Sequence, residues 1–205
     1  VEVAKSGKGQ IIDSAMTDGS ALLMSMMYGF YSAGIWNDHR ESNLLDGAAH
    51  FYGCYECKDN KFVSIGSIEP QFYQELIKRL EVDEETFKDQ MDRSKWPKLK
   101  KILEKKFKEK TREEWCEIME GGDVCFAPVL SLEESINYKH NKDRETFVNI
   151  DGVTQPAPAP RFSNTPGKIK HPPVRKGENT REILKSIGKE DLVQELVESK
   201  IISEG

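Results

Sequence analysis

The sequence predicts a mixed α/β protein that contains an α+β unit with a β-hairpin and several helices. Two strand-like runs flank the turn-forming stretch 58–60, a pattern typical of a hairpin over residues 51–66. Three later segments carry apolar residues at helical spacing. With 205 residues, the chain can form one sizeable core or two modest ones. The expected helices lie near residues 70–80, 98–109 and 112–120.

The first zone, residues 1–45, consists of a strand-like QII, an aspartate, a helical run and a polar link. Asp13 directly follows the β-branched pair. It is therefore either the N-cap of the next helix or a functional acid at the positive end of that helix. Residues 21–36 are the most apolar stretch, but they are too few, and too often interrupted by Gly and Ser, for a membrane span. We expect a buried helix there.

The second zone, residues 46–140, has the most regular pattern. Its helices begin at typical capping sequences, because Pro70 and Pro97 suit a first helical turn and TREE, residues 111–114, is a capping-box pattern. The lysine-rich run KWPKLKKILEKKFKEK is the solvated face of an amphipathic helix. The apolar face of that helix consists of Leu99, Ile102, Leu103 and Phe107.

A short strand at 125–130 completes the main part of this zone. Pro128 cannot donate to a sheet hydrogen bond, so the strand lies at an edge or an end. Ser131 caps a further helix. We expect the hairpin, the three helices and this strand to pack as one unit. The side chains expected in its core are Phe62, Ile65, Phe72, Leu76, Trp115 and Phe126.

The third zone, residues 141–205, has less regular structure. The stretch KDRETFVNIDGV indicates strands, and the Pro-rich stretch after it lacks periodicity and resembles an extended arm. Two short amphipathic helices follow between residues 180 and 202, divided at Gly188.

The composition excludes several classes of function. Lys and Arg together number 30 and Asp and Glu 35, mixed along the chain, for a formal net charge of −5. Nothing in this distribution resembles a surface that follows the phosphates of a nucleic acid, so we expect no nucleic-acid partner. The chain also opens without a secretory signal.

The four cysteines do not form a disulfide scaffold in a chain of this size. Cys54 and Cys57 form a C-x-x-C pair, but on a strand this spacing directs the two thiols to opposite faces. Neither a nearby His nor a second C-x-x-C completes a zinc set. We therefore expect no metal site and a reducing, intracellular compartment.

Several longer motifs are more specific than these patterns. GQIIDSAM, NLLDGAAHFYGCYECKDNKFVSIGSIEPQFYQELIKRL, EWCEIMEGGDVCFAPVL, HNKDRETF and GENTREIL resemble, in order, the α-methylacyl-CoA racemase branch of the family III CoA-transferases, the CaiB/BaiF type. The resemblance runs from about residue 8 to the C-terminal helices. The phrase IGSIEPQFY favours the racemase branch, because a glycine-rich loop tends to occupy this region in the transferase branch.

The resemblance implies a domain organisation. Family members have a large Rossmann-like domain built from both ends of the chain, a small domain inserted between, and two subunits interlocked as a homodimer. On this template, residues 1–45 end the first segment of the large domain, 46–140 form the small domain, and 141–205 return to the large domain. The N-terminal nucleotide-binding half is missing. It would carry the catalytic histidine, whose motif surrounds none of His39, His50, His140 and His171.

The resemblance also implies a reaction, the racemisation of 2-methylacyl-CoA thioesters. Inverting the α-carbon requires one base on each face, and the family's G-Q-x-x-D motif makes Asp13 one of them, with the absent histidine as the other. The first N–H groups of the following helix would stabilise the enolate oxygen. Ser14 and Glu69 are candidate substrate-binding residues. No cofactor is implied, since CoA is part of the substrate, and we expect this fragment alone to be inactive.

Two alternatives remain at this point. In the transferase branch the same aspartate, Asp13, would be a nucleophile that carries the acyl group as a mixed anhydride. The chain could also be a non-catalytic fragment. One residue departs from the racemase pattern: Lys98 follows Trp96-Pro97, where relatives commonly carry a Glu that supports the catalytic histidine. Relatives work in peroxisomes and mitochondria, although ISEG is not a peroxisomal signal of the Ser-Lys-Leu type.

Overall fold

The computed structural model describes residues 1–203 and divides into two compact units, Val1–Val129 and a second that begins at Leu130. Helices combine with two small antiparallel sheets, which confirms the predicted mixed α/β class. In chain order, the first unit contains α1 (Glu2–Ser6), α2 (Met16–Leu23), α3 (Ser25–Ser32), β1 (Tyr52–Glu56), β2 (Phe62–Gly66), α4 (Pro70–Leu80), α5 (Glu84–Phe87), α6 (Trp96–Phe107), α7 (Arg112–Met119) and β3 (Phe126–Val129). The second contains α8 (Leu132–Asn137), α9 (Lys139–Asp143), β4 (Phe147–Ile150), β5 (Val153–Pro156), α10 (Thr180–Ser186), the 3₁₀ helix η1 (Glu190–Leu192) and α11 (Val193–Glu198).

A three-stranded antiparallel sheet of order β1-β2-β3 organises the first unit. The predicted hairpin is confirmed as β1–β2, and its turn contains Asn60 at a positive φ of 59°, which Asn adopts more readily than most residues. β3 lies at an edge, with Pro128 opposite Val63, as the missing proline N–H requires. We call β1–β3 with α4–α7, residues 43–129, the compact domain.

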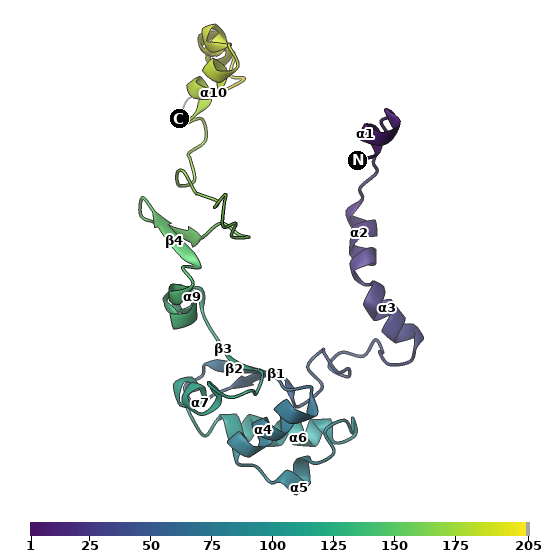
Figure 1. Ribbon diagram of the computed structural model, residues 1–205. Coiled ribbons are helices and arrows are strands. Elements are labelled where there is room, and N and C mark those ends of the chain that lie inside the picture. The colour runs from purple at the N-terminus through teal and green to yellow at the C-terminus, as the bar shows by residue number, and fades with distance from the viewer. Residues whose placement is uncertain (204–205) are drawn as a thin grey trace. The chain divides into compact units, whose positions relative to one another are not determined.

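Helices α4, α6 and α7 lie against one face of this sheet (Figure 1). The strand residues that face the helices, Tyr55, Val63 and Ile65, are buried. The ring of Tyr55 stacks on Phe107 of α6 at 4.8 Å between centroids, and Phe107 meets Trp115 of α7 edge-on. Burial of one such side chain stabilises the fold by roughly 1.5–3 kcal/mol. The other large side chains that are fully buried include Phe51, Phe87, Leu76, Leu80, Leu99 and Leu103.

The core prediction holds for most of its residues. Of the six side chains expected in the core, Phe72 and Phe126 are half-buried. The prediction for Phe62 is wrong, because this side chain is 45% exposed. Side chains alternate between the faces of a strand, and Phe62 lies on the face of β2 opposite to the buried Val63. The expected residues that are buried are Ile65, Leu76 and Trp115.

The helix starts predicted for residues 46–140 are confirmed. Pro70 lies in the first turn of α4. Thr111 and Glu114 form a capping box at α7, and Ser131 and Glu134 form the same arrangement at α8. In each box the hydroxyl oxygen accepts a backbone N–H of the first turn, while the glutamate accepts the N–H of the cap residue. Local sequence therefore sets these boundaries without help from distant contacts.

The first 36 residues, which we call the N-terminal segment, differ from their prediction. Residues 10–12 form no strand, and α2 begins at Met16 with Ala15 as its N-cap, so Asp13 is not the cap. The expected buried helix is instead two consecutive helices, α2 and α3, without a buried residue. Leu23, for example, is 87% exposed. The reason is that no described element covers this apolar surface.

The second unit confirms its predicted elements. The β4–β5 hairpin turns at Asp151 and Gly152, with φ of 50° and 85°, as a tight hairpin turn requires. The Pro-rich residues 157–179 form neither helix nor strand. The C-terminal helices α10 and α11 are divided at Gly188, whose φ is 67°. Within the described chain, no helix has the length and apolar character needed to cross a membrane.

Candidate active site

Asp13 lies in the stretch between α1 and α2, which is neither helix nor strand. Its side chain is exposed and makes no hydrogen bond or ion pair within residues 1–203. Ser14, next to it, is also exposed. The expectation that the helix N–H groups start at Asp13 is wrong, because the first turn of α2 begins at Met16. Asp13 therefore has no capping role, and its carboxylate is free of structural partners in the described chain.

A well-supported turn joins β2 to α4 and contains most of the phrase IGSIEP. Residues 66–69 are called the Ser67 turn below. Ser67 is fully buried, and its hydroxyl donates to the carbonyl oxygen of Val124 at 2.6 Å. Its backbone N–H donates to the carbonyl oxygen of Phe51 at 3.0 Å. The turn is thus fastened both to the residue before β1 and to the segment before β3.

Gln90, in the loop between α5 and α6, completes the support of this turn. Its side-chain amide nitrogen donates to the carbonyl oxygens of Ser67 at 3.0 Å and Ile68 at 2.8 Å. The indole N–H of Trp96 donates to the backbone carbonyl of Gln90 at 2.8 Å. Gln90 is not predictable from sequence, because a single Gln in a polar loop forms no pattern. Its position shortly before the Trp-Pro pair was the one available clue.

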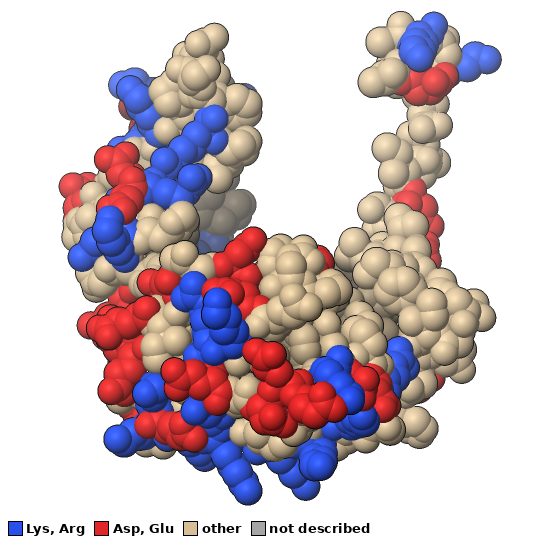
Figure 2. Space-filling model, turned by 60° about the horizontal axis from the view of Figure 1, so that its bottom comes forward, with Lys and Arg blue, Asp and Glu red and all other residues tan. Residues whose placement is uncertain are grey.

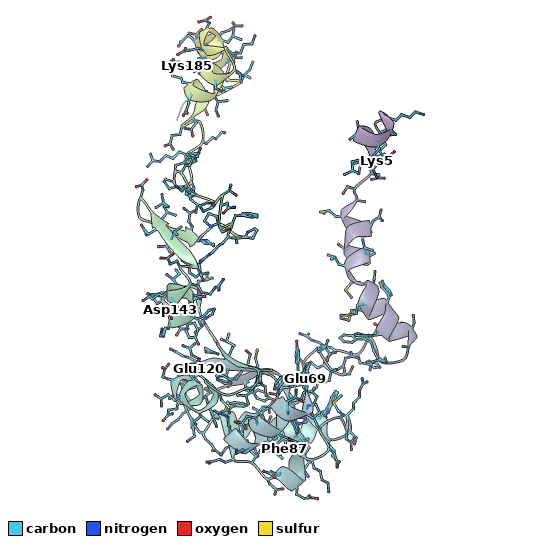
Figure 3. The ribbon with its side chains drawn as sticks, in the orientation of Figure 1. Lys5, Glu69, Phe87, Glu120, Asp143 and Lys185 are labelled. Atoms are coloured by element: carbon cyan, nitrogen blue, oxygen red, sulfur yellow. The ribbon has the colours of Figure 1, made fainter. Side chains whose placement is uncertain are left out.

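Glu69 stands at the end of the Ser67 turn as the N-cap of α4, with an extended backbone at φ −70° and ψ 141°. Its carboxylate is exposed at the start of α4 (Figure 3) and makes no capping hydrogen bond. Burial raises the pKa of the nearby Cys125 thiol, and the Glu69 carboxylate raises it further. The backbone of Glu69 is therefore fixed by the turn and the start of α4, while its carboxylate is exposed and makes no capping hydrogen bond.

The predicted site residues come from separate parts of the first unit. No hydrogen bond or ion pair joins Asp13 or Ser14 to Glu69 among the described residues. Lys98 is exposed on α6 and lines a shallow hollow with Lys101 and Lys105. On the face shown in Figure 2, acidic and basic side chains are interspersed.

His50 is a packed histidine. It is fully buried, and its Nε2 lies 2.7 Å from the Tyr73 hydroxyl, which donates to the carbonyl oxygen of Phe87 at 2.9 Å. Because the hydroxyl hydrogen is used there, the His50 Nε2 carries the proton in this pair. Burial lowers the pKa of His50 to about 4. The histidines at 39, 140 and 171 are exposed.

The cysteines follow the strand argument. Cys54 is exposed on β1, and Cys57, three residues on, is buried, so the expected difference in face is confirmed. Burial raises the pKa of the Cys57 thiol to about 11, which keeps it protonated and a poor metal ligand at neutral pH. The described residues contain no group of three or more His, Cys, Asp or Glu side chains arranged to hold a metal ion.

Residues 1–180 match the family model "CoA-transferase family III". The chain belongs to this family. It is 41% identical to mouse α-methylacyl-CoA racemase over 94% of its own length and 52% of the mouse protein, and 41% identical to the human racemase over 97% and 53%. Human succinyl-CoA:glutarate CoA-transferase is 22% identical over 100% of this chain and 49% of its own length. The chain thus spans about half the length of these relatives.

Solved structures of the family share the fold. A CaiB/BaiF family protein from Brucella suis superposes with a TM-score of 0.66 over 90% of this chain and 50% of its own, at 19% identity. A hypothetical protein from Mycobacterium tuberculosis gives 0.63 over 87% and 48%, at 16% identity.

Proposed function

We propose that this chain is part of a racemase that inverts the α-carbon of 2-methylacyl-CoA thioesters. The observation that carries the proposal is the 41% identity to two α-methylacyl-CoA racemases over nearly the whole chain, against 22% to a CoA-transferase. The phrase IGSIEPQFY, which favours the racemase branch, contains the Ser67 turn, which side-chain hydrogen bonds of Ser67 and Gln90 hold in place.

The reaction requires a base that removes the α-proton and an acid that returns a proton to the opposite face. We assign one of these roles to Asp13 and the other to a histidine upstream of the chain. The carboxylate of Asp13 is exposed and makes no structural hydrogen bond among residues 1–203, so it can accept and release a proton without breaking the fold. CoA enters as part of the substrate, and no other cofactor is needed.

Glu69 and Ser14 are proposed to face the substrate. Glu69 is the better supported of the two, because the Ser67 turn fixes its backbone while its carboxylate stays exposed. A rigid backbone that presents an unpartnered polar group is the arrangement that substrate positioning demands. An enolate needs fixed dipoles near the thioester oxygen.

The assembly is proposed to be an interlocked homodimer whose subunits divide at residues 45/46 and 140/141 into the family's large and small domains. Large apolar side chains exposed on the N-terminal segment support burial by another part of such an assembly. They include Ile11, Ile12, Met16, Leu22 and Leu23. A peroxisomal or mitochondrial location is part of the same proposal.

The experiment uses the complete gene product in D₂O with one enantiomer of a 2-methylacyl-CoA and no acceptor acid. A racemase incorporates deuterium at the α-carbon and forms the other enantiomer. In a parallel reaction with a carboxylic acid added, transfer of CoA to that acid without α-proton exchange would instead show that the protein is a transferase and overturn the proposal. The 205-residue chain alone should give no inversion, because one proton carrier is missing.

The role of Asp13 is tested separately from the reaction class. Asp13→Asn removes the titratable group, and general acid/base groups contribute about 10²–10⁴-fold, so inversion should fall by that factor. Exchange from the face served by the histidine should survive in part. Inversion at the wild-type rate in Asp13→Asn would remove Asp13 from the mechanism and leave the racemase proposal standing.

A further inference from the structure

The side chain of Gln90 hydrogen-bonds to two consecutive peptide groups of the Ser67 turn. The Gln90 amide has two N–H donors, and they reach the carbonyl oxygens of Ser67 and Ile68 at 3.0 Å and 2.8 Å. Neither carbonyl oxygen has another hydrogen-bond donor among the described residues. Removing this amide would leave both oxygens without a partner beside a buried side chain, a costly arrangement.

The backbone of Gln90 is fixed in turn. Trp96, 2% exposed, donates its indole N–H to the Gln90 carbonyl and packs edge-on against Phe51 with ring centroids 5.8 Å apart. The carbonyl of Phe51 accepts the N–H of Ser67. The contacts therefore form a closed circuit from Phe51 through Trp96, Gln90 and Ser67 back to Phe51. A circuit of buried contacts restrains the turn more than a single bond would.

We infer that Gln90 is a positioning residue: its hold on the Ser67 and Ile68 carbonyls fixes the start of α4 and thereby the place at which Glu69 presents its carboxylate. The inference rests on the proposed racemase function and adds a residue to it. Gln90 is 8% exposed and donates to the carbonyl oxygen of Ile68, the residue directly before Glu69, so it acts through the turn and not by touching the substrate.

Gln90→Met tests this in the complete gene product, because Met keeps the length and approximate volume of Gln but has no N–H donor. We expect kcat for α-proton exchange to fall by up to ~10²-fold, the effect of a small misplacement of a group that orients substrate, with KM changed far less. The matched control is Thr111→Ala, which weakens the same domain at the α7 capping box without contacting the turn. It should keep the wild-type kcat below its unfolding temperature.

Two further readouts separate positioning from general destabilisation. Amide hydrogen exchange should accelerate over residues 66–69 in Gln90→Met and over the start of α7 in Thr111→Ala. In a double-mutant cycle with Glu69→Gln, the two substitutions should be strongly non-additive, because Gln90 is expected to act through Glu69. Glu69→Gln itself should lower kcat.

Each result bears on the inference. A wild-type kcat in Gln90→Met, full additivity with Glu69→Gln, or an equal loss of kcat in Thr111→Ala would overturn the positioning role while leaving the racemase proposal intact. Absence of α-proton exchange in the wild type would overturn both. Reduced kcat, faster exchange confined to the turn and non-additivity together would support it.

Discussion

The compact domain and the N-terminal segment both contain helices with large apolar side chains, but the burial of those side chains is opposite. In α6, Leu103 is 0% exposed, whereas Leu23 in α2 is 87% exposed. The difference is in partners: α6 lies against β1, and α2 touches chiefly its neighbour α3. An apolar helical face predicts that a surface will be covered, but the covering element has to be present in the same chain. Among the described residues, the N-terminal segment has no element that covers its apolar side chains.

The largest expected effect is the difference in stability lost when each of these two leucines is replaced by alanine. Leu103→Ala leaves a cavity in a closed core and should lower the free energy of unfolding of the 205-residue chain by about 2–5 kcal/mol. Leu23→Ala should change it by less than about 0.5 kcal/mol, since the side chain is already in water. Urea unfolding followed by tryptophan fluorescence measures both, because Trp96 and Trp115 lie in the core. Equal losses in the two variants would break the comparison.

The second expected effect is a loss of stability at acidic pH. Burial lowers the pKa of His50 from its ordinary 6.5 to about 4 in the fold, so the unfolded chain binds an extra proton between these pH values. Stability is therefore greatest above pH 6.5 and falls as the pH drops from 6.5 to 4, by on the order of 3 kcal/mol. His50→Gln keeps a donor for the Tyr73 hydroxyl but does not titrate. Its unfolding free energy should be flatter over this range, and a slope like that of the wild type would contradict the assignment.

The smallest expected effect on stability concerns two residues that sequence alone presents as helix N-caps, Thr111 and Asp13. Thr111→Ala removes the α7 capping box and should cost about 1 kcal/mol. Asp13→Ala should leave the unfolding free energy of this chain within about 0.5 kcal/mol of the wild type, because Ala15 and not Asp13 is the N-cap of α2. Thermal unfolding of the two variants decides the point, and a loss for Asp13→Ala as large as that for Thr111→Ala would restore the capping interpretation.

The elements fixed by local rules could be predicted from sequence. Pro70 and the Thr111–Glu114 box mark helix starts through their own backbone and side-chain chemistry, and these starts agree with the structure. Phe62 was misplaced because strand alternation does not say which face the helices will cover. The start of α2 was misplaced because an Asp after two β-branched residues favours a cap without requiring one.

The candidate site was predictable only in part. Glu69 is predictable because it lies in a long motif, and Asp13 because it is the last residue of the G-Q-x-x-D motif. The hydrogen bonds that support the backbone before Glu69 come instead from Gln90 and Ser67. These contacts join residues more than twenty positions apart, and no local spacing encodes them. Family resemblance directs attention to a loop, while the hydrogen bonds show how that loop is held.

Hydrogen exchange of the 205-residue chain tests most directly the claim that the compact domain holds its own core and the N-terminal segment does not. We expect the amides of α4, α6 and α7 to exchange only through large-scale unfolding, and those of α1–α3 to exchange near the rates of an unstructured peptide. Mass spectrometry of peptides from both regions gives the two rates side by side. Strong protection of α2 and α3 in this chain, comparable to that of α6, would contradict the account.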